Sequence, residues 1–179
     1  MIKYLGSKRT LTPILGDIAS ESGATQAVDL FTGTTRVAQE FKRRGLDVLA
    51  NDIATYSEVM ADCYIATDAD AIKADELRAA LDDLNRLPGK RGYFTRTFCE
   101  ESRYFQPKNG ARVDAIREAI DDRFSDSWMR PILLTSLMLA ADRVDSTTGV
   151  QMAYLKQWAP RAYNDLELRV PELISGCGR

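Results

Sequence analysis

The sequence predicts an α/β fold built around one strand–turn–helix–strand stretch near the N-terminus, followed by a mostly helical region. A short apolar run at 26–30 leads into a small-residue turn at 31–35 and then a helical pattern. A second short run at 48–51 is closed by Asp52. From residue 67 onward, apolar residues recur mainly at helical spacing. A strand, a glycine turn, a helix and an acid after the next strand are typical of nucleotide-binding cradles.

The first third of the chain divides into five predicted elements. The apolar residues from Leu11 to Ile18 fall at helical spacing, Pro13 suits a first helical turn, and a small polar cluster at 20–23 ends the helix. The strand at 26–30 follows. A helix at 36–44 ends at Gly45, a typical C-terminal residue. The second strand covers 48–51, and the spacing predicts a helix over 55–65.

The pattern of the remaining residues predicts three helices and one strand. An acidic amphipathic helix at 74–87 stops at a Pro-Gly pair. The segment 90–109 is aromatic, basic and without clear periodicity. Helices follow at 111–124 and 131–144, then a polar loop at 145–149. The tail 166–171 has the pattern of a strand, and no internal repeat is visible.

Composition narrows the classes of function. The chain has 179 residues, 45% hydrophobic and 28% charged, with a net charge of −2, which is ordinary for a globular domain. It has no apolar run of membrane-spanning length and no signal peptide, so we expect a cytoplasmic protein with no membrane partner. The absence of histidine excludes Ser-His-Asp and Cys-His catalysis and the common zinc sites, and we expect no metal. Three dispersed cysteines argue against a disulfide framework.

Two features carry alternatives that the residues alone leave open. A single glycine at 33 falls short of G-x-G-x-x-G, so the stretch 28–52 fits a cofactor site or an ordinary strand–helix turn, with Asp52 as a strand-end cap. The segment 86–117 holds eight Lys or Arg against three Asp or Glu, interleaved with aromatics. That pattern suits phosphate contacts and base stacking, or a solvated face over a small aromatic core.

Several short motifs in order resemble the Dam-like adenine-N6 DNA methyltransferases. The start, Lys3-Tyr4-Leu5-Gly6-Ser7-Lys8, is similar to that family's K-W/Y-x-G-x-K motif. The segment 29–35 resembles its D-x-F-x-G-x-G loop, and Asn51-Asp52 resembles the end of its next strand. The stretches 103–109 and 141–150 resemble parts of its inserted region.

The resemblance implies a Rossmann-like, S-adenosylmethionine-dependent core. Tyr4 would pack against the cofactor and Lys8 would hold its carboxylate. The loop 29–35 would pass under the methionine end, and Asp52 would accept hydrogen bonds from the ribose hydroxyls. The implied cofactor-binding residues are Tyr4, Lys8, Asp29, Phe31, Gly33, Thr34 and Asp52.

The resemblance also implies a division of the chain and a DNA partner. Residues 1–65 would be the N-terminal part of the cofactor-binding core. Residues 66–170 would be a mostly helical target-recognition insert facing double-stranded DNA, and 171–179 would return toward the core. The implied DNA-binding residues are Arg91, Arg96, Arg103, Lys108, Arg143 and Lys156.

Two departures qualify what the resemblance implies. Thr35 stands where many relatives have glycine. The family's catalytic D/N-P-P-Y/F is absent, since no two prolines are adjacent in the sequence. We therefore expect an incomplete Rossmann-like core: a truncated or split methyltransferase, inactive alone, whose missing half a second chain supplies. The strand at 26–30 would then be a sheet edge. The alternatives are a non-catalytic DNA-binding or regulatory module, or an enzyme using another nucleotide.

Overall fold

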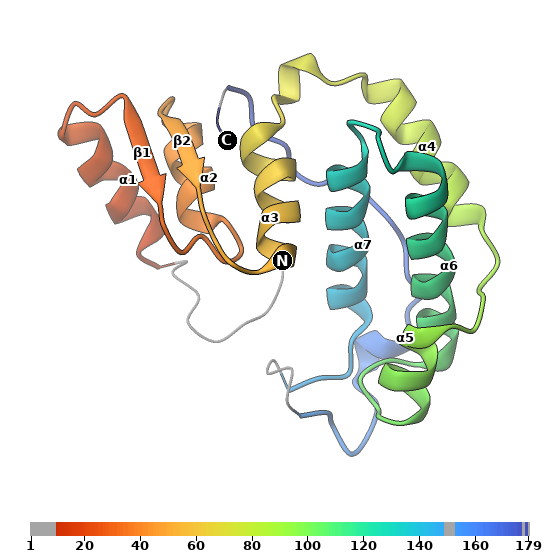
Figure 1. The fold of residues 1–179 in the computed structure, drawn as a ribbon. Helices are drawn as coiled ribbons and strands as arrows, with labels where there is room; N and C mark the ends of the chain where they lie inside the picture. The colour runs from red at the N-terminus through yellow and green to blue at the C-terminus, as the bar shows by residue number, and fades with distance from the viewer. Residues whose placement is uncertain (1–9, 149–152, 177, 179) are drawn as a thin grey trace. The chain divides into compact units, whose positions relative to one another are not determined.

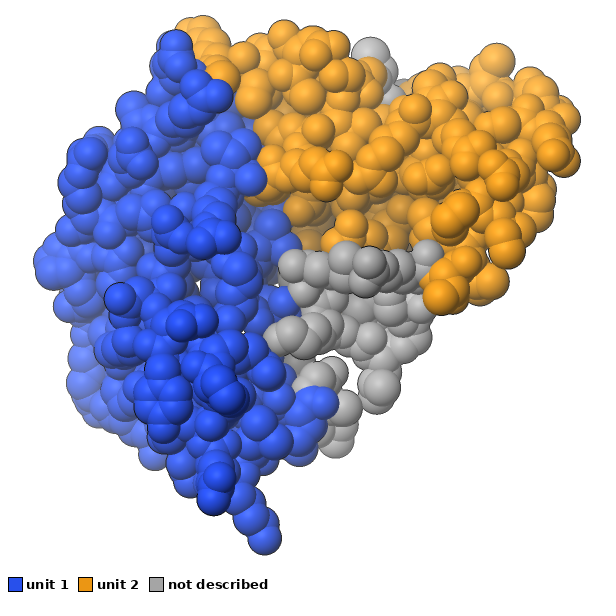
Figure 2. Space-filling view, turned by 180° about the vertical axis from the view of Figure 1, so that it is seen from behind, with its two compact units in different colours: residues 1–5, 75–170 blue, residues 6–74, 171–179 orange. Residues whose placement is uncertain are grey.

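The computed structural model describes residues 10–148, 153–176 and 178. The fold is mixed α/β, mostly helical with a small two-stranded parallel sheet (Figure 1). The described residues form two compact units, shown in different colours in Figure 2. The sheet unit comprises residues 10–74, 171–176 and 178, and the helical unit comprises residues 75–148 and 153–170. None of the helices in these ranges has the length and apolar character needed to cross a membrane.

The sheet unit follows the predicted order of elements to within one or two residues at most boundaries. The predicted helix over 55–65 is divided, because its second half is wound as a π-helix. The elements are α1 (Thr12–Glu21), β1 (Gln26–Asp29), α2 (Arg36–Arg43), β2 (Asp47–Ala50), α3 (Thr55–Ala61), the π-helix η1 (Asp62–Ala66) and the 3-10 helix η2 (Ala69–Ala71).

The two strands pair in parallel, and only one face of the sheet is buried. Val28 is the register partner of Leu49, and Ala27 is the partner of Val48. Val48 is fully buried on the face covered by α2, which packs against both strands. Val28 and Leu49 share the opposite face and are 55% and 41% exposed. Gly178 forms a parallel bridge with Val48, so β2 is flanked on both sides.

A buried lysine joins α2 to the π-helix η1. The Nζ atom of Lys42 donates to the carbonyls of Tyr64, Ile65 and Thr67 at 3.2, 2.8 and 2.6 Å. The last carbonyls of a helix lack intrahelical partners, so a cation at this end is favourable. Lysine side chains are usually exposed, so only the tertiary structure shows that Lys42 is buried.

The helical unit packs its helices around an aliphatic core. Its elements are α4 (Ala74–Arg86), α5 (Tyr93–Thr95), the π-helix η3 (Arg96–Glu100), α6 (Pro107–Phe124), α7 (Arg130–Val144) and the 3-10 helix η4 (Pro160–Tyr163). The predicted helices at 74–87, 111–124 and 131–144 are all present, and α6 begins earlier than the spacing indicated. Its largest fully buried side chains are Leu77, Leu84, Ile116, Ile120, Ile132 and Leu133.

Part of the segment 90–109, which has no clear period in the sequence, is helical in the structure. The Asp114 carboxylate accepts hydrogen bonds from the amides of Gly92, Phe94 and Thr95 and from the Thr95 hydroxyl, at 2.6–3.0 Å. These are the orphan donors at the start of a helix. The helix begins here because a residue about twenty positions downstream caps it, which periodicity cannot reveal.

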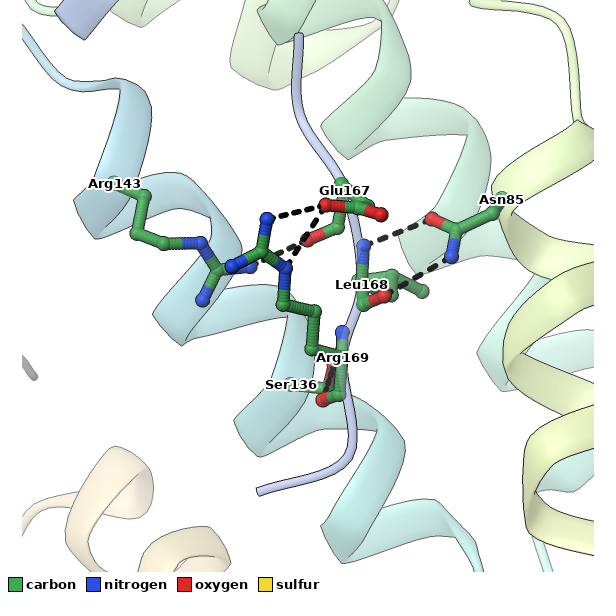
Figure 3. A network of polar contacts seen from close by, with 6 residues as sticks. All are labelled: Asn85, Ser136, Arg143, Glu167, Leu168 and Arg169. Carbon is green, nitrogen blue, oxygen red and sulfur yellow. Dashed lines mark hydrogen bonds and ion pairs between the residues drawn. The ribbon is translucent and has the colours of Figure 1, made fainter. Parts of the chain in front are cut away.

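The strand predicted at 166–171 is wrong, because this segment is extended but joins no sheet. Side chains from two helices, α4 and α7, take the place of a neighbouring strand (Figure 3). Asn85 accepts from the amide of Leu168 at 2.8 Å and donates to its carbonyl at 3.0 Å. The Ser136 hydroxyl likewise bonds both backbone groups of Arg169, and Arg143 donates to the carbonyl of Glu167.

Candidate functional site

The candidate site lies where the two strands of the sheet unit end. Asp29 and Ala50 are the last register pair, so the loop 30–35 and the loop 51–54 leave the sheet at the same edge. In parallel α/β sheets, ligands bind outside the carboxyl ends of the strands. The structure therefore brings Asp29, Gly33 and Asp52 to the same edge of the sheet.

Asp52 joins these two loops directly. Its Oδ2 accepts from the amide of Gly33 at 2.8 Å, and its Oδ1 accepts from the amide of Ala54 at 3.0 Å. The Ala54 amide, followed by that of Gly33, holds the pKa of Asp52 below its usual value. The carboxylate thus caps the end of the second strand and also joins the loop 51–54 to the loop 30–35. A carboxylate has about four lone-pair sites, and the amide of Ile53 also acts on this one, so some acceptor capacity remains for a ligand.

The turn at Gly33 leaves open space on the side where a side chain would stand. Gly33 has φ +51°, and a Cβ built on it has no heavy atom within 4 Å. Thr35 also has a positive φ, at 60°, and is the one non-glycine residue that does so in the described ranges. Glycine adopts this conformation without steric cost. The same conformation strains a β-branched residue.

Hydrogen bonds from side-chain hydroxyl and amide groups fix the loop 30–35. Thr32 Oγ1 donates to Asp29 Oδ2 at 3.0 Å, while Thr35 Oγ1 accepts from the Gln39 amide at 2.8 Å. The side chain of Asn51 donates to the carbonyl of Leu30 at 3.0 Å. Sequence reasoning missed Gln39 and the role of Asn51. Position 51, directly before Asp52, was the only signal that could have indicated the second.

Side chains around this cradle differ sharply in exposure. Thr34 is buried, with 5% of its surface exposed, whereas Phe31 is 80% exposed. Ile53, on the second loop, is fully exposed. Phe31 therefore offers an apolar face beside Gly33. Tyr4 and Lys8, the remaining cofactor candidates, lie outside the described residues.

Four of the six cationic side chains predicted to bind DNA are engaged within the helical unit. Arg91 forms a two-bond ion pair with Glu100, and Lys108 bonds Asp165 at 2.6 Å. Arg143 donates to the carbonyl of Glu167, and burial lowers its pKa. Arg103 donates to the carbonyl of Lys156 at 2.8 Å and stacks 4.9 Å from the Trp158 ring centroid.

Arg96 and Lys156 are different. Both are exposed, and their side chains form no hydrogen bond or ion pair with the described part of the chain. Aromatic rings connect the segments that carry them. Edge-to-face contacts run from Tyr93 to Phe98, Tyr104 and Tyr154, with centroids 5.3–6.4 Å apart. Tyr93 and Tyr154, at the ends of this row, are exposed. We call this row with Arg96 and Lys156 the aromatic–basic surface.

Comparisons with known proteins agree with the motifs. A family model described as D12 class N6 adenine-specific DNA methyltransferase matches residues 4–178. The type II methyltransferase M.NlaIII of Neisseria lactamica is 33% identical over 93% of this chain and 53% of its own length. The modification methylase StsI of Streptococcus sanguinis is 30% identical, over 94% of this chain and 28% of its own.

A viral relative shows the same partial overlap. The type II methyltransferase M.CviAII of Paramecium bursaria Chlorella virus 1 is 32% identical over 90% of this chain and 51% of its own length. The chain thus spans about half the length, or less, of these relatives. No solved structure matches it. With the family model covering almost every residue, the chain belongs to the D12 class N6 adenine-specific DNA methyltransferase family.

Proposed function

We propose that this chain supplies the cofactor cradle and the DNA-contacting surface of an adenine-N6 DNA methyltransferase. The reaction is transfer of the methyl group of S-adenosylmethionine to the N6 amino group of a DNA adenine. The observation that carries the proposal is the pairing of Gly33 and Asp52 at the carboxyl edge of the sheet, within a chain of this family.

The residues of the cradle suit S-adenosylmethionine. Asp52 is held as an anion by two amides and keeps lone pairs for the ribose hydroxyls. The open space at Gly33 admits a ligand close to the backbone, and exposed Phe31 offers an apolar contact. The Asp29 carboxylate accepts from the Thr32 hydroxyl and the Thr34 carbonyl accepts from the Thr35 hydroxyl, so both residues help to fix the loop that would contact the cofactor. When bound, the cofactor supplies an electrophilic methyl group. This part of the chain binds and orients it.

The aromatic–basic surface is the proposed DNA contact. Arg96 and Lys156 are the cations free to neutralise phosphates. Arg91 and Lys108 would first have to break their ion pairs with carboxylates of the helical unit. Tyr93 and Tyr154 present exposed rings on which bases can stack. Arg103 holds the backbone at Lys156 and so positions that segment.

The groups that act on the adenine amino group are proposed to lie in another polypeptide segment. The family's D/N-P-P-Y/F accepts from the target amino group and stacks on the flipped base, and these 179 residues do not contain it. The relatives are about twice as long or longer. We therefore propose that turnover needs a segment that carries this tetrapeptide.

Isothermal titration calorimetry with S-adenosylmethionine tests the cradle. Replacing Asp52 by Ala should weaken binding by on the order of 1–3 kcal/mol, because a hydrogen-bonded acceptor is lost. Asp47→Ala is the matched control: this exposed carboxylate begins the same strand and bonds only the Gln26 side chain among described partners. Equal affinities for the wild type and Asp52→Ala would remove Asp52 from the site, and tighter binding of a nicotinamide dinucleotide would favour another cofactor.

Salt-dependent DNA binding tests the aromatic–basic surface. The double variant Arg96→Ala, Lys156→Ala should lower the slope of log affinity against log salt by about 2, one unit per lost phosphate contact. The paired cations provide the control, since Arg91→Ala with Lys108→Ala should change the slope less. A larger change in the control pair would contradict the assignment.

A second candidate function is a non-catalytic DNA-binding or regulatory module. The missing tetrapeptide together with the free cations at 96 and 156 favours it. Transfer of radiolabelled methyl groups to DNA distinguishes the two. Turnover that appears when the remainder of the fold is added supports the enzyme. DNA binding without cofactor binding or turnover supports the module.

A further inference from the structure

Two short arms of the helical unit, residues 146–148 and 153–156, pair antiparallel. A bridge and two backbone hydrogen bonds, of 3.0 and 3.4 Å, join them. The second arm carries Tyr154 and Lys156, two exposed members of the aromatic–basic surface. Of the residues in the two arms, only Ser146 is buried. A pair of strands without an apolar core is marginal by itself, so the arms need support from outside.

Arg161 supplies that support at the base of the first arm. Its Nε atom donates to Asp145 Oδ1 at 2.6 Å, and its Nη2 atom donates to the carbonyl of Thr147 at 2.8 Å. Asp145 also accepts from the Thr147 hydroxyl at 2.5 Å, and its side chain is only 8% exposed. Because a buried carboxylate is costly when it is left unpaired, this contact holds more firmly than an ion pair in solvent.

Ser146 attaches the same base to the aromatic row. Its amide donates to the carbonyl of Tyr104 at 2.7 Å, and its hydroxyl accepts from the amide of Ala159 at 3.0 Å. The Tyr104 ring in turn contacts the Tyr154 ring edge to face, with centroids 5.3 Å apart. The backbone at 145–147 therefore fixes where the exposed ring of the second arm lies.

We propose that Arg161 is a positioning residue for DNA binding. Through Asp145 it holds the two arms, so that Tyr154 and Lys156 meet DNA in one arrangement. This inference rests on the proposed function. The guanidinium is not itself the phosphate contact, because its Nε and Nη2 atoms are already bonded within the chain. Arms that are held before DNA arrives lose less conformational entropy on binding.

A double-mutant cycle on the whole chain tests this role. Affinity is measured by fluorescence anisotropy, at low salt, with a labelled DNA duplex of mixed sequence. Arg161→Met should weaken binding about fivefold to tenfold in the wild type, but less than about twofold in a chain that already carries Tyr154→Ala and Lys156→Ala. If the effects instead multiply in full, Arg161 acts independently of the arms and the proposal is wrong.

Arg161→Lys separates positioning from a direct phosphate contact. Lysine keeps the positive charge but lacks the planar fork that reaches Asp145 and the Thr147 carbonyl together. The lysine variant should therefore bind DNA nearly as weakly as Arg161→Met. Binding equal to that of the wild type would show that the charge alone matters, and would overturn the positioning role.

Arg130→Met is the matched control. Arg130 forms an ion pair with Asp121 at 3.0 Å, and its side chain is 33% exposed, against 35% for Arg161. This variant should bind DNA like the wild type. A wild-type chain that binds no DNA contradicts the proposed DNA contact itself, whereas DNA binding with multiplicative effects in the cycle contradicts only the role of Arg161.

Hydrogen exchange distinguishes a local effect from a general loss of folding. In Arg161→Met, the amides of Thr148 and Leu155, which join the two arms, should exchange faster than in the wild type. The amides of α6 should exchange at the wild-type rate. Faster exchange throughout the helical unit would show that Arg161 supports the whole fold, and the positioning role would then be rejected.

Discussion

The two units differ in which large apolar side chains they leave exposed to solvent. In the helical unit, the exposed large apolar residues are mostly Tyr and Trp, and the buried side chains of Asn109 and Ser136 have specific partners. In the sheet unit, they are largely aliphatic, at 11, 14, 18, 28, 30, 49 and 53. Exposed tyrosine is compatible with water at one end of its ring, whereas exposed isoleucine and leucine are not.

Among the described residues, the helical unit therefore buries its aliphatic side chains more fully than the sheet unit does. A two-stranded sheet is marginal by itself and needs further strands or a second helical layer. Here α2 covers one face, and the other face ends in solvent. The helical unit instead closes its irregular segment 162–169 with side chains of its own helices. Four comparisons between variants can break or sharpen this contrast.

The largest expected effect lies in the helical unit, at Asn109. This side chain is buried, donates to the carbonyls of Ala162 and Asn164, and accepts from the amide of Leu166. Asn109→Leu would leave these backbone groups buried without partners, so the free energy of unfolding should fall by about 3 kcal/mol or more. Urea denaturation measures it.

The neighbouring residue provides the control for that prediction. Lys108 is exposed, and its ion pair with Asp165 lies in solvent. Lys108→Met should change the free energy of unfolding by less than about 1 kcal/mol. Similar losses for the two variants would show that the extended segment is not fixed by Asn109.

The contrast between the two faces of the sheet is the next largest effect. Val48→Ala removes two methyl groups from a fully buried site and should cost about 2 kcal/mol. Val28→Ala makes the same change on the open face and should cost less than about 0.5 kcal/mol in the chain alone. Thermal unfolding of the two variants compares them. A comparable loss at Val28 means that its face is covered in solution.

Strain at Thr35 is expected to have a smaller effect. Thr35→Gly and Thr35→Ala both remove the hydroxyl that bonds Gln39, but only glycine adopts a φ of 60° without steric cost. The glycine variant should therefore be the more stable by about 1 kcal/mol. Denaturant titration of both variants measures the difference, and an alanine variant at least as stable would show that the position is unstrained.

The smallest effect concerns pH. Burial raises the pKa of Asp114, but the hydroxyl and amide of Thr95 and the amides of Phe94 and Gly92 lower it more, so it lies below 3.8. A depressed carboxyl pKa gives stability above the unfolded value that is lost as pH falls through the folded value. The stability difference between wild type and Asp114→Asn should thus shrink below about pH 4. Asp122→Asn, an exposed carboxylate on α6, should show little difference at any pH.

Local sequence predicted most of the elements. The glycines at 23 and 45 follow helices and have positive φ, and the pattern of 26–52 predicted both strands. The hydrogen bond between Gly33 and Asp52 is visible only in the structure. Local sequence gave neither the division of the helix at 55–65 nor the helical turns at 93–100. Those depend on Lys42 and Asp114, whose partners lie about twenty residues away.

Sequence by itself determined the family, the parallel strand pair and the loops that meet at its edge, because period, turn chemistry and motif order are local properties. Tertiary structure decided which polar groups are satisfied. Arg91 and Arg96 are alike in the sequence, yet Glu100 forms its ion pair with Arg91. The strand-like segment at 166–171 lies among helices instead of in a sheet, because Asn85 and Ser136 satisfy its backbone. Such outcomes depend on contacts between distant residues, which no local pattern encodes.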